Sequence, residues 1–257
     1  MNPNDAIKLT IIAGDIMLSS GAETYRVEDT MLRILMSCGL GSPESLCTTT
    51  SIFASGTGPD GTPVTSIKRV KNRGGNFEKI AYVNELSRNF VDGKLSVDEA
   101  IAALENIRSI PPYPHLIRLV GSAVASFCFA TMLGGSFMDS ANAFIAAFLM
   151  QIPVLFLEKH NVAAVLRNIV GGGCAALFAL IILFLGLGDT IDFIIIGAIM
   201  PLVPGVSLTN AIRDILDGDL LSGSARILDA FLVAIGIAVG VGTVFTVWIS
   251  VFGGVAL

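Results

Sequence analysis

The residues of this chain best suited to chemistry are four polar side chains in an otherwise apolar stretch. They are Ser207, Asn210, Asp214 and Asp217. Their steps of three, four and three residues place all of them on one face of a helix. Hydroxyl, amide and carboxylate groups bind polar solutes, and a carboxylate can also carry a proton. Such groups are costly in lipid unless they line a cavity or a protein interface. The stripe therefore predicts a solute pathway, and a solvated helix end is the alternative.

The stripe follows a break in the apolar run 191–216. The run begins with residues that are apolar apart from Asp192. A continuous helix is then disfavoured by Pro201, Pro204 and Gly205, because proline lacks a backbone donor and glycine permits unusual dihedrals. We expect two half-helices, and the positive end of the second can face a solute carboxylate. The predicted substrate-binding residues of this half-helix are Ser207, Thr209, Asn210 and Asp214.

Other polar groups in apolar spans are candidates of second rank. Gln151 needs a partner in lipid, and with Pro153 it predicts a lesser break in its span. Asp214 and Asp217 are the leading candidates for proton coupling, and Asp229 is a further one. Arg226 precedes Asp229 by three residues and is expected to anchor the last span at the membrane interface.

Composition identifies an integral membrane protein. The chain has 257 residues, of which 53% are hydrophobic and 14% charged, and its mean hydropathy is +0.75. Those values exceed what a soluble domain of this size carries. Apolar segments long enough to cross a bilayer lie near 116–134, 140–157, 164–187, 191–216 and 227–253. The predicted fold is an α-helical polytopic membrane protein of about five transmembrane helices, one broken, preceded by a small α+β cytosolic domain.

The first domain is predicted to cover residues 1–110. Helical periodicity indicates helices over 4–19, 22–37, 77–91 and 96–109, and a turn at 58–61 joins two β-rich segments into a hairpin. Ser20 with Glu23, and Ser96 with Glu99, have the spacing of capping boxes. A proline-rich hinge at 111–115 leads to the transmembrane domain, 116–257.

Charge at the membrane ends predicts the orientation. The cations at these ends share one side and are Arg118, Lys159, Arg167, Arg213 and Arg226, while the opposite connections carry Asp139, Asp189 and Asp192. The positive side is cytoplasmic by the positive-inside rule. The chain does not begin with a secretory signal. We therefore expect the N-terminus in the cytoplasm and the protein in the cytoplasmic (inner) membrane. Five crossings would then place Leu257 outside.

Several function classes are excluded or unsupported. The four cysteines show no metal-binding spacing, and no cofactor motif is present, so neither a metal nor a cofactor is predicted. A net charge of −5 gives no nucleic-acid footprint. A membrane-bound hydrolase using Ser20 or Cys47 is a weak alternative, since the two histidines, His115 and His160, both lie beside membrane ends.

Two motifs together resemble a known family. They are SGAETYRVE at 20–28 and PGVSLTN at 204–210, the latter followed by Arg213-Asp214 and Gly218-Asp219. This combination resembles the threonine/serine exporter family, and in particular the N-terminal-domain subunit of its two-component members, which are associated with succinate export. The resemblance implies proton-driven export of a small organic acid or amino acid, with a second small membrane subunit as partner. It also singles out the first-domain motif residues Ser20, Glu23, Arg26 and Glu28.

Two alternatives concern assembly. The chain is either a transporting subunit or a non-transporting regulatory partner whose polar stripe is an assembly interface. Glycines at 171–173 and 236–240 let helix backbones approach closely, and these faces are predicted to dock the partner. The alternative to a separate partner subunit is a homo-oligomer of this chain. Membrane lipid is expected to surround either assembly.

Overall fold

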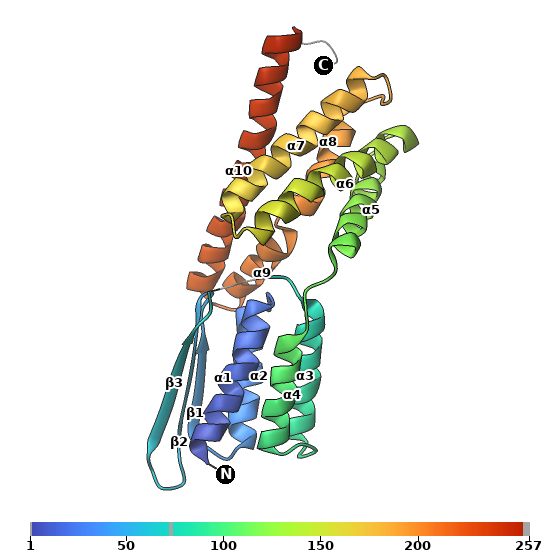
Figure 1. The fold of residues 1–257 in the computed structure, drawn as a ribbon. Helices are drawn as coiled ribbons and strands as arrows, with labels where there is room; N and C mark the ends of the chain where they lie inside the picture. The colour runs from blue at the N-terminus through green and yellow to red at the C-terminus, as the bar shows by residue number, and fades with distance from the viewer. Residues whose placement is uncertain (1, 72–73, 254–257) are drawn as a thin grey trace. The chain divides into compact units, whose positions relative to one another are not determined.

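The computed structural model describes residues 2–71 and 74–253, so Leu257 lies outside the described residues. The chain forms two compact units, Met1–Pro112 with Val206–Ile227, and Tyr113–Gly205 with Leu228–Leu257. The elements of Figure 1 are, in order, α1 (Pro3–Ser19), α2 (Thr24–Ser37), β1 (Gly41–Cys47), β2 (Ser51–Thr57), β3 (Pro63–Arg69), α3 (Phe77–Val91), α4 (Val97–Ser109), α5 (His115–Met132), α6 (Phe137–Lys159), α7 (Ala164–Phe184), α8 (Ile191–Ile199), η1 (Met200–Leu202), α9 (Gly205–Leu216) and α10 (Leu220–Phe252).

The first unit is built in three layers. An antiparallel sheet of order β1-β2-β3 lies against α1 and α2, and α3 and α4 cover the other side of these helices (Figure 1). Strand β2 alternates, so Ile52 and Ala54 face the helices and are fully buried. The core includes Met17, Met31 and Leu35, each with no exposed surface. The predicted helices and the β2–β3 hairpin are confirmed.

Two local predictions in this unit are corrected. Strand β1 was not predicted as a strand of its own, because it contains Pro43 and its side chains are mostly exposed, which leaves no clear alternation. The Ser20–Glu23 capping box does not form: α2 begins at Thr24 with Glu23 as N-cap residue and without a side-chain cap bond. The Glu23 carboxylate binds arginines instead. The Ser96–Glu99 capping box is present with both of its hydrogen bonds.

Residues 206–227 pack with this first unit, although the sequence analysis assigned them to the transmembrane domain. Helix α9 ends in a turn where Gly218 has a φ of +93°, a conformation that favours glycine. The Asp219 carboxylate then accepts from the amide of Ser222 in the first turn of α10. The first turns of α10 lie so close to α9 that a Cβ on Gly223 would clash with the Ile215 side chain. This helical hairpin brings the start of α10 beside the polar face of α9.

The second unit is a bundle in which α6 packs against α5, α7 and α8. Arg118 of α5 makes a bidentate ion pair with Glu158 at the end of α6, and Arg167 of α7 lies 3.5 Å from the same carboxylate. At the other end of α6, the Asp139 carboxylate accepts from the backbone amides of Asp189 and Thr190. The unit therefore gathers Arg118 and Arg167 around Glu158 at one end and holds Asp139 at the other, and the positions of these two arginines and of Asp139 agree with the charge pattern.

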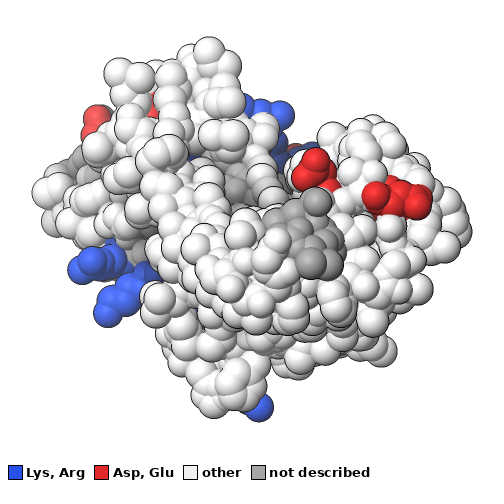
Figure 2. Space-filling model, turned by 90° about the horizontal axis from the view of Figure 1, so that it is seen from above, with Lys and Arg blue, Asp and Glu red and all other residues white. Residues whose placement is uncertain are grey.

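Among the described residues, four helices are long and apolar enough to cross a membrane, and a fifth span is present if Ile191–Leu202 and Gly205–Leu216 count as one broken span. Four of the five predicted spans thus correspond to a helix of sufficient length, and the predicted break after α8 is confirmed by a bend of 60° between the two halves. Figure 2 shows a face of the molecule covered mostly by uncharged residues. The lesser break predicted at Gln151 and Pro153 is wrong, because α6 continues through Pro153.

The glycine-rich faces pack against each other within the chain. A Cβ on Gly172 would meet the carbonyl oxygen of Ile237 at 2.5 Å, and one on Gly240 would clash with that of Ile169. The prediction that these faces dock a partner is therefore wrong. The glycines do permit two helix backbones to approach closely, but these helices are α7 and α10 of the same chain.

Candidate functional site

The centre of the candidate site is the carboxylate of Asp214 on α9, which has no exposed surface. Its Oδ1 accepts from the backbone amide of Thr24, and its Oδ2 accepts from the Thr24 hydroxyl, both at 3.2 Å. Thr24 is the first residue of α2, so its amide has no acceptor inside its own helix. Asp214 thus supplies a negative charge at the positive end of α2, where it is favoured.

Arg226 on α10 balances this buried charge. Its Nε lies 2.9 Å from Asp214 Oδ2, a charge contact whose angle does not make a hydrogen bond. Its Nη2 donates to the carbonyl oxygen of Ala22 at 2.9 Å. The Arg226 side chain is 9% exposed, so the pair is shielded from water. A buried ion pair of this kind depends on both partners, since removing one leaves an uncompensated charge.

Two more side chains of α9 hold the same loop, residues 20–23 between α1 and α2. The Asn210 amide donates to the carbonyl oxygen of Gly21 at 3.0 Å. Arg213 Nη1 donates to Glu23 Oε1 at 2.7 Å, and the other oxygen of Glu23 lies 3.3 Å from Arg26 Nε. Gly21 has a φ of +91°, and a Cβ there would meet the Gly74 carbonyl at 2.8 Å. We call the group of Glu23, Thr24, Asn210, Arg213, Asp214 and Arg226 the Asp214 cluster.

The Asp214 cluster joins the two sequence motifs, which lie about 190 residues apart in the chain. Its carboxylates and guanidiniums pair with one another; Glu23, Asp214 and Arg226 are buried, whereas the Arg213 side chain is 51% exposed. A solute carboxylate has the same chemistry as Asp214 and Glu23, so it can compete with them for Arg226 and Arg213. Protonation of Asp214 would remove the negative charge that pairs with Arg226. The cluster thus contains side chains of the types that bind a carboxylate and that carry a proton.

The remaining predicted site residues lie in several places. On α9, Ser207 is half-buried, whereas Thr209 and Asp217 are exposed. Gln151 is buried on α6 in the second unit, and Asp229 is exposed on α10. Of the predicted stripe, the structure places Asn210 and Asp214 in the Asp214 cluster, where they hydrogen-bond the α1–α2 loop.

The first-domain motif residues divide in the same way. Glu23 belongs to the Asp214 cluster, and Arg26 contacts it from the first turn of α2. Ser20 is buried, and its carbonyl oxygen accepts from the amide of Asn76 at 3.0 Å. Glu28 Oε1 accepts from the amide of Cys47 at 2.6 Å. Burial raises the pKa of Glu28, and the Cys47 hydrogen bond opposes this.

The two proposed nucleophiles are not arranged for hydrolysis. Burial and then the charge of Glu28 raise the pKa of the Cys47 thiol, which is the opposite of what activates a thiolate. Ser20 is 4% exposed, and both histidines belong to the second unit. No group of three or more metal-ligating side chains occurs within residues 2–71 and 74–253.

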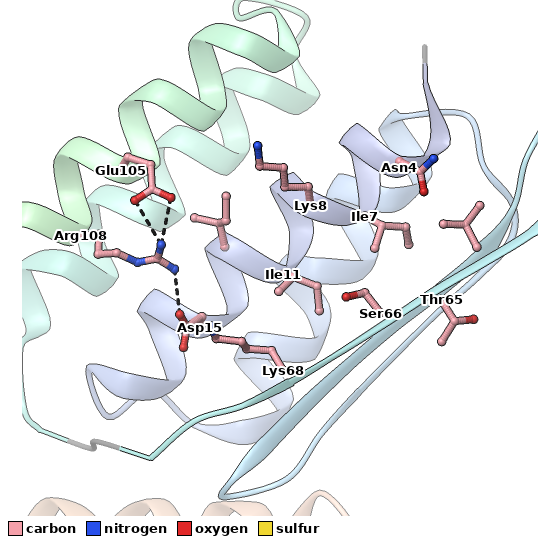
Figure 3. Close-up of a pocket in the computed structure, with 12 residues that line it drawn as sticks. Asn4, Ile7, Lys8, Ile11, Asp15, Thr65, Ser66, Lys68, Glu105 and Arg108 are labelled. Carbon is pink, nitrogen blue, oxygen red and sulfur yellow. Dashed lines mark hydrogen bonds and ion pairs between the residues drawn. The ribbon is translucent and has the colours of Figure 1, made fainter.

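A separate cavity of about 470 Å³ lies between α1, β3 and α4 of the first unit (Figure 3). Ile7, Ile11 and Ile12 form an apolar part of its wall. At one end Arg108 donates to Asp15 at 2.8 Å and to Glu105 at 2.9 Å, as the dashed lines of Figure 3 show. Arg108 is the only arginine among the described residues that line this cavity, and two carboxylates already bind it.

Arg226, like Arg213, was assigned by sequence reasoning to another role, that of a cation at a membrane end. It was expected at the membrane interface, but it lies against Asp214 and Ala22. A signal for this contact was present: Gly218 and Asp219 form a turn-and-cap sequence between Asp214 and Arg226, so two antiparallel helices would return the cation to the carboxylate. No comparable local signal in the sequence indicated that the α1–α2 loop would also contact Asp214 and Arg226.

Comparison with known proteins places this arrangement in a family. The model of a family described as threonine/serine exporters matches residues 8–248, which include every member of the Asp214 cluster. The chain belongs to the threonine/serine exporter family. The family resemblance noted from the two motifs is confirmed. With its four or five candidate spans, this family member is a multi-pass membrane protein.

Its curated relatives in the family are of two lengths. A probable threonine/serine exporter of Mycobacterium tuberculosis is 26% identical over 243 residues, 94% of this chain but 46% of the relative. The threonine/serine exporter of Corynebacterium glutamicum is 29% identical, over 89% of this chain and 48% of the relative. The probable succinate transporter subunit YjjP of Escherichia coli strain K12 is 24% identical, over 94% of each chain. The chain thus spans about half the length of the two exporters. No solved structure matches it significantly.

Proposed function

We propose that this chain is a subunit of a secondary transporter that exports small polar metabolites across the cytoplasmic membrane. The solutes are a dicarboxylate such as succinate, or threonine and serine, which are the compounds in the names of its relatives. The observation that carries the proposal is the family match over residues 8–248 of a chain with four or five candidate spans. The protein acts by binding and release, and no catalytic step is proposed.

The proposed solute-handling centre is the Asp214 cluster. An incoming carboxylate replaces Asp214 or Glu23 as the partner of Arg226 or Arg213. The N-terminal half of α9 offers Ser207 and Thr209 as further polar contacts. Asp214 takes the proton that couples export to the gradient, because protonation weakens its pairing with Arg226. Gln151 is proposed as a solute contact elsewhere along the pathway, and Asp217 and Asp229 are the alternative proton carriers.

The proposed orientation places residues 1–110 in the cytosol, residues 111–115 as a hinge and residues 116–257 as the transmembrane domain, of which the segment 206–227 packs with the first unit. The separation of charge in the second unit supports it, since Arg118 and Arg167 meet at one end and Asp139 lies at the other. By the positive-inside rule the arginine end faces the cytoplasm, as does the N-terminus.

A second small membrane subunit is the proposed partner. The chain covers nearly all of a relative named as a transporter subunit, but only about half of each longer exporter. Alternating access commonly requires two repeats that move about a site at their interface, and this chain supplies one set of spans. The partner has to contact a face other than the α7–α10 glycines, which pack together inside this chain.

Reconstitution tests the proposal. The chain is placed in lipid vesicles with and without the partner, and efflux of labelled succinate, threonine and serine is followed under an imposed pH gradient. We expect efflux only with both subunits. Efflux from the chain alone would overturn the two-subunit proposal and favour a homo-oligomer. Partner efflux that persists without this chain would make it a regulatory or assembly subunit.

Substitutions test the centre. Asn210→Ala and Asp214→Asn are expected to abolish export, because they remove groups that meet the solute or the proton. Their amount in the membrane is measured alongside, since both side chains also hold the α1–α2 loop. Asp217→Asn and Asp229→Asn remove carboxylates outside the cluster and are expected to transport. Normal export by the Asp214→Asn variant, or loss of export only in one of the other two, would move the proton site.

A further inference from the structure

A groove between α2 and α3 in the first unit gathers three guanidinium groups. Arg26 and Arg33 lie about two turns apart on one face of α2, and Arg88 lies opposite on α3. The only carboxylate among the described lining residues is Asp29, so the groove carries a net charge of about +2 at neutral pH. Its volume is about 260 Å³, which suits a solute smaller than a drug-sized ligand.

The arginines of this groove keep donors for a ligand. The hydrogen bonds and ion pairs of all three use Nε: Arg26 contacts Glu23, Arg33 donates to Asp29, and Arg88 donates to the carbonyl oxygen of Asn84. Each guanidinium has two further nitrogens in a planar fork that matches a carboxylate or phosphate. By contrast, Arg108 in the cavity of Figure 3 already uses both of these nitrogens on carboxylates.

Two hydroxyls and one amide complete the lining. The Thr30 hydroxyl donates to the carbonyl oxygen of Arg26, and the Ser87 hydroxyl donates to that of Asn84. Both hydroxyl protons are therefore used in hydrogen bonds to the backbone, and the hydroxyl oxygens keep lone pairs that can accept hydrogen bonds. The Asn84 side-chain amide also lines the groove and can donate to an anion. The donors outnumber the acceptors, so the chemistry favours an anion over a cation or an apolar molecule.

The groove is linked to the Asp214 cluster through one side chain. Glu23 has one oxygen 3.3 Å from Arg26 and the other 2.7 Å from Arg213. A dianion bound to the other two nitrogens of Arg26 draws this guanidinium toward the groove and weakens its Nε contact with Glu23, because both anions share one planar group. When Arg26 turns to the dianion, Glu23 keeps Arg213 as its cationic partner and the α1–α2 loop loses one of its contacts.

We propose that the groove of Arg26, Arg33 and Arg88 is a binding site for a compact dianion, either a small dicarboxylate or inorganic phosphate, and that its occupancy loosens the α1–α2 loop. Binding itself is independent of the proposed function. Its consequence for export, a solute-dependent adjustment of the Asp214 cluster, rests on that function.

Isothermal titration of the purified full chain in detergent with succinate and, separately, inorganic phosphate tests the binding. Saturable binding of either anion is expected, and the stronger one identifies the source. Arg88→Gln and Arg33→Gln should each weaken binding about tenfold or more, the effect of one charge-assisted hydrogen bond. The matched control is Arg69→Gln, an exposed arginine on β3 outside the groove, which should bind as the original chain does.

Several outcomes would overturn the site: no saturable binding of either anion, equal binding by the Arg88→Gln and Arg69→Gln variants, or binding lost in Asn210→Ala but kept in Arg88→Gln. The last result would place the anion at the Asp214 cluster. Hydrogen exchange tests the link, since saturating anion should speed exchange of the 21–24 amides at least threefold in the original chain and leave Arg88→Gln unchanged. Unchanged exchange in the original chain would refute the coupling.

Discussion

Replacement of Arg226 by glutamine tests whether the buried ion pair holds the Asp214 cluster together. The substitution leaves Asp214, with no exposed surface, without its cation. Breaking a buried pair from one side costs about 3–5 kcal/mol. We expect the lower end of this range, because two hydrogen bonds from Thr24 still solvate the Asp214 carboxylate. Arg226→Gln also removes the donor to Ala22, a neutral acceptor, which contributes about 1 kcal/mol.

The amide of Thr24 reports this loss directly. It donates to Asp214 and has no acceptor within α2, so its protection from hydrogen exchange depends on the Asp214 contact. A loss of about 3 kcal/mol corresponds to roughly 150-fold faster exchange when opening is a rapid equilibrium. Exchange measured by mass spectrometry on the full chain in detergent micelles, at peptides covering residues 20–27, gives this ratio.

Two controls make the result specific to burial of the pair. Lys94→Gln breaks an exposed ion pair with Asp92, whose side chains are 62% and 56% exposed, and it should cost less than about 1 kcal/mol. The double variant Asp214→Asn with Arg226→Gln removes both charges and should exchange more slowly than Arg226→Gln alone, because no uncompensated charge remains. Thr24 protection within threefold of the original chain in Arg226→Gln, or strictly additive effects in the double variant, would refute the reasoning.

Three other outcomes follow from the structure. Gly240→Ala should destabilise the α7–α10 contact by about 1–3 kcal/mol, since its Cβ would clash with the Ile169 carbonyl, whereas Gly242→Ala has open space and should leave the melting temperature unchanged. Burial raises the pKa of Glu28, so the neutral form is favoured in the fold, and the stability that it contributes is present below the unfolded pKa and lost as the pH rises through the folded pKa. Glu28→Gln should therefore gain stability relative to the original chain as the pH increases from 4 to 7, and a pH-independent difference in denaturant unfolding would contradict this. In a chain whose native cysteines are replaced, Leu187→Cys in the α7–α8 loop should react with an impermeant maleimide added to intact cells and His160→Cys should not, and the reverse pattern would invert the proposed topology.

Sequence alone was sufficient for the elements whose signals are local. Helices α1 to α4 and the apolar spans follow from periodicity and hydropathy, and the break after α8 follows from Pro201 and Pro204. The Ser96–Glu99 capping box also forms, because all of its partners lie within four residues of each other on an exposed helix start. These features need no knowledge of what packs against them.

Only the tertiary structure decided which distant groups meet. Ser20 and Glu23 have the same capping-box spacing as Ser96 and Glu99, but Arg213 lies 2.7 Å from Glu23 and offers its carboxylate a full charge in place of a backbone amide. The partners of Asp214 likewise come from α2 and α10, at separations that no periodicity encodes. The glycines of α7 and α10 were recognisable as close-packing residues, yet their spacing does not say which backbone will approach. A buried charge or an open backbone specifies the kind of partner it requires, and the fold determines which residue provides it.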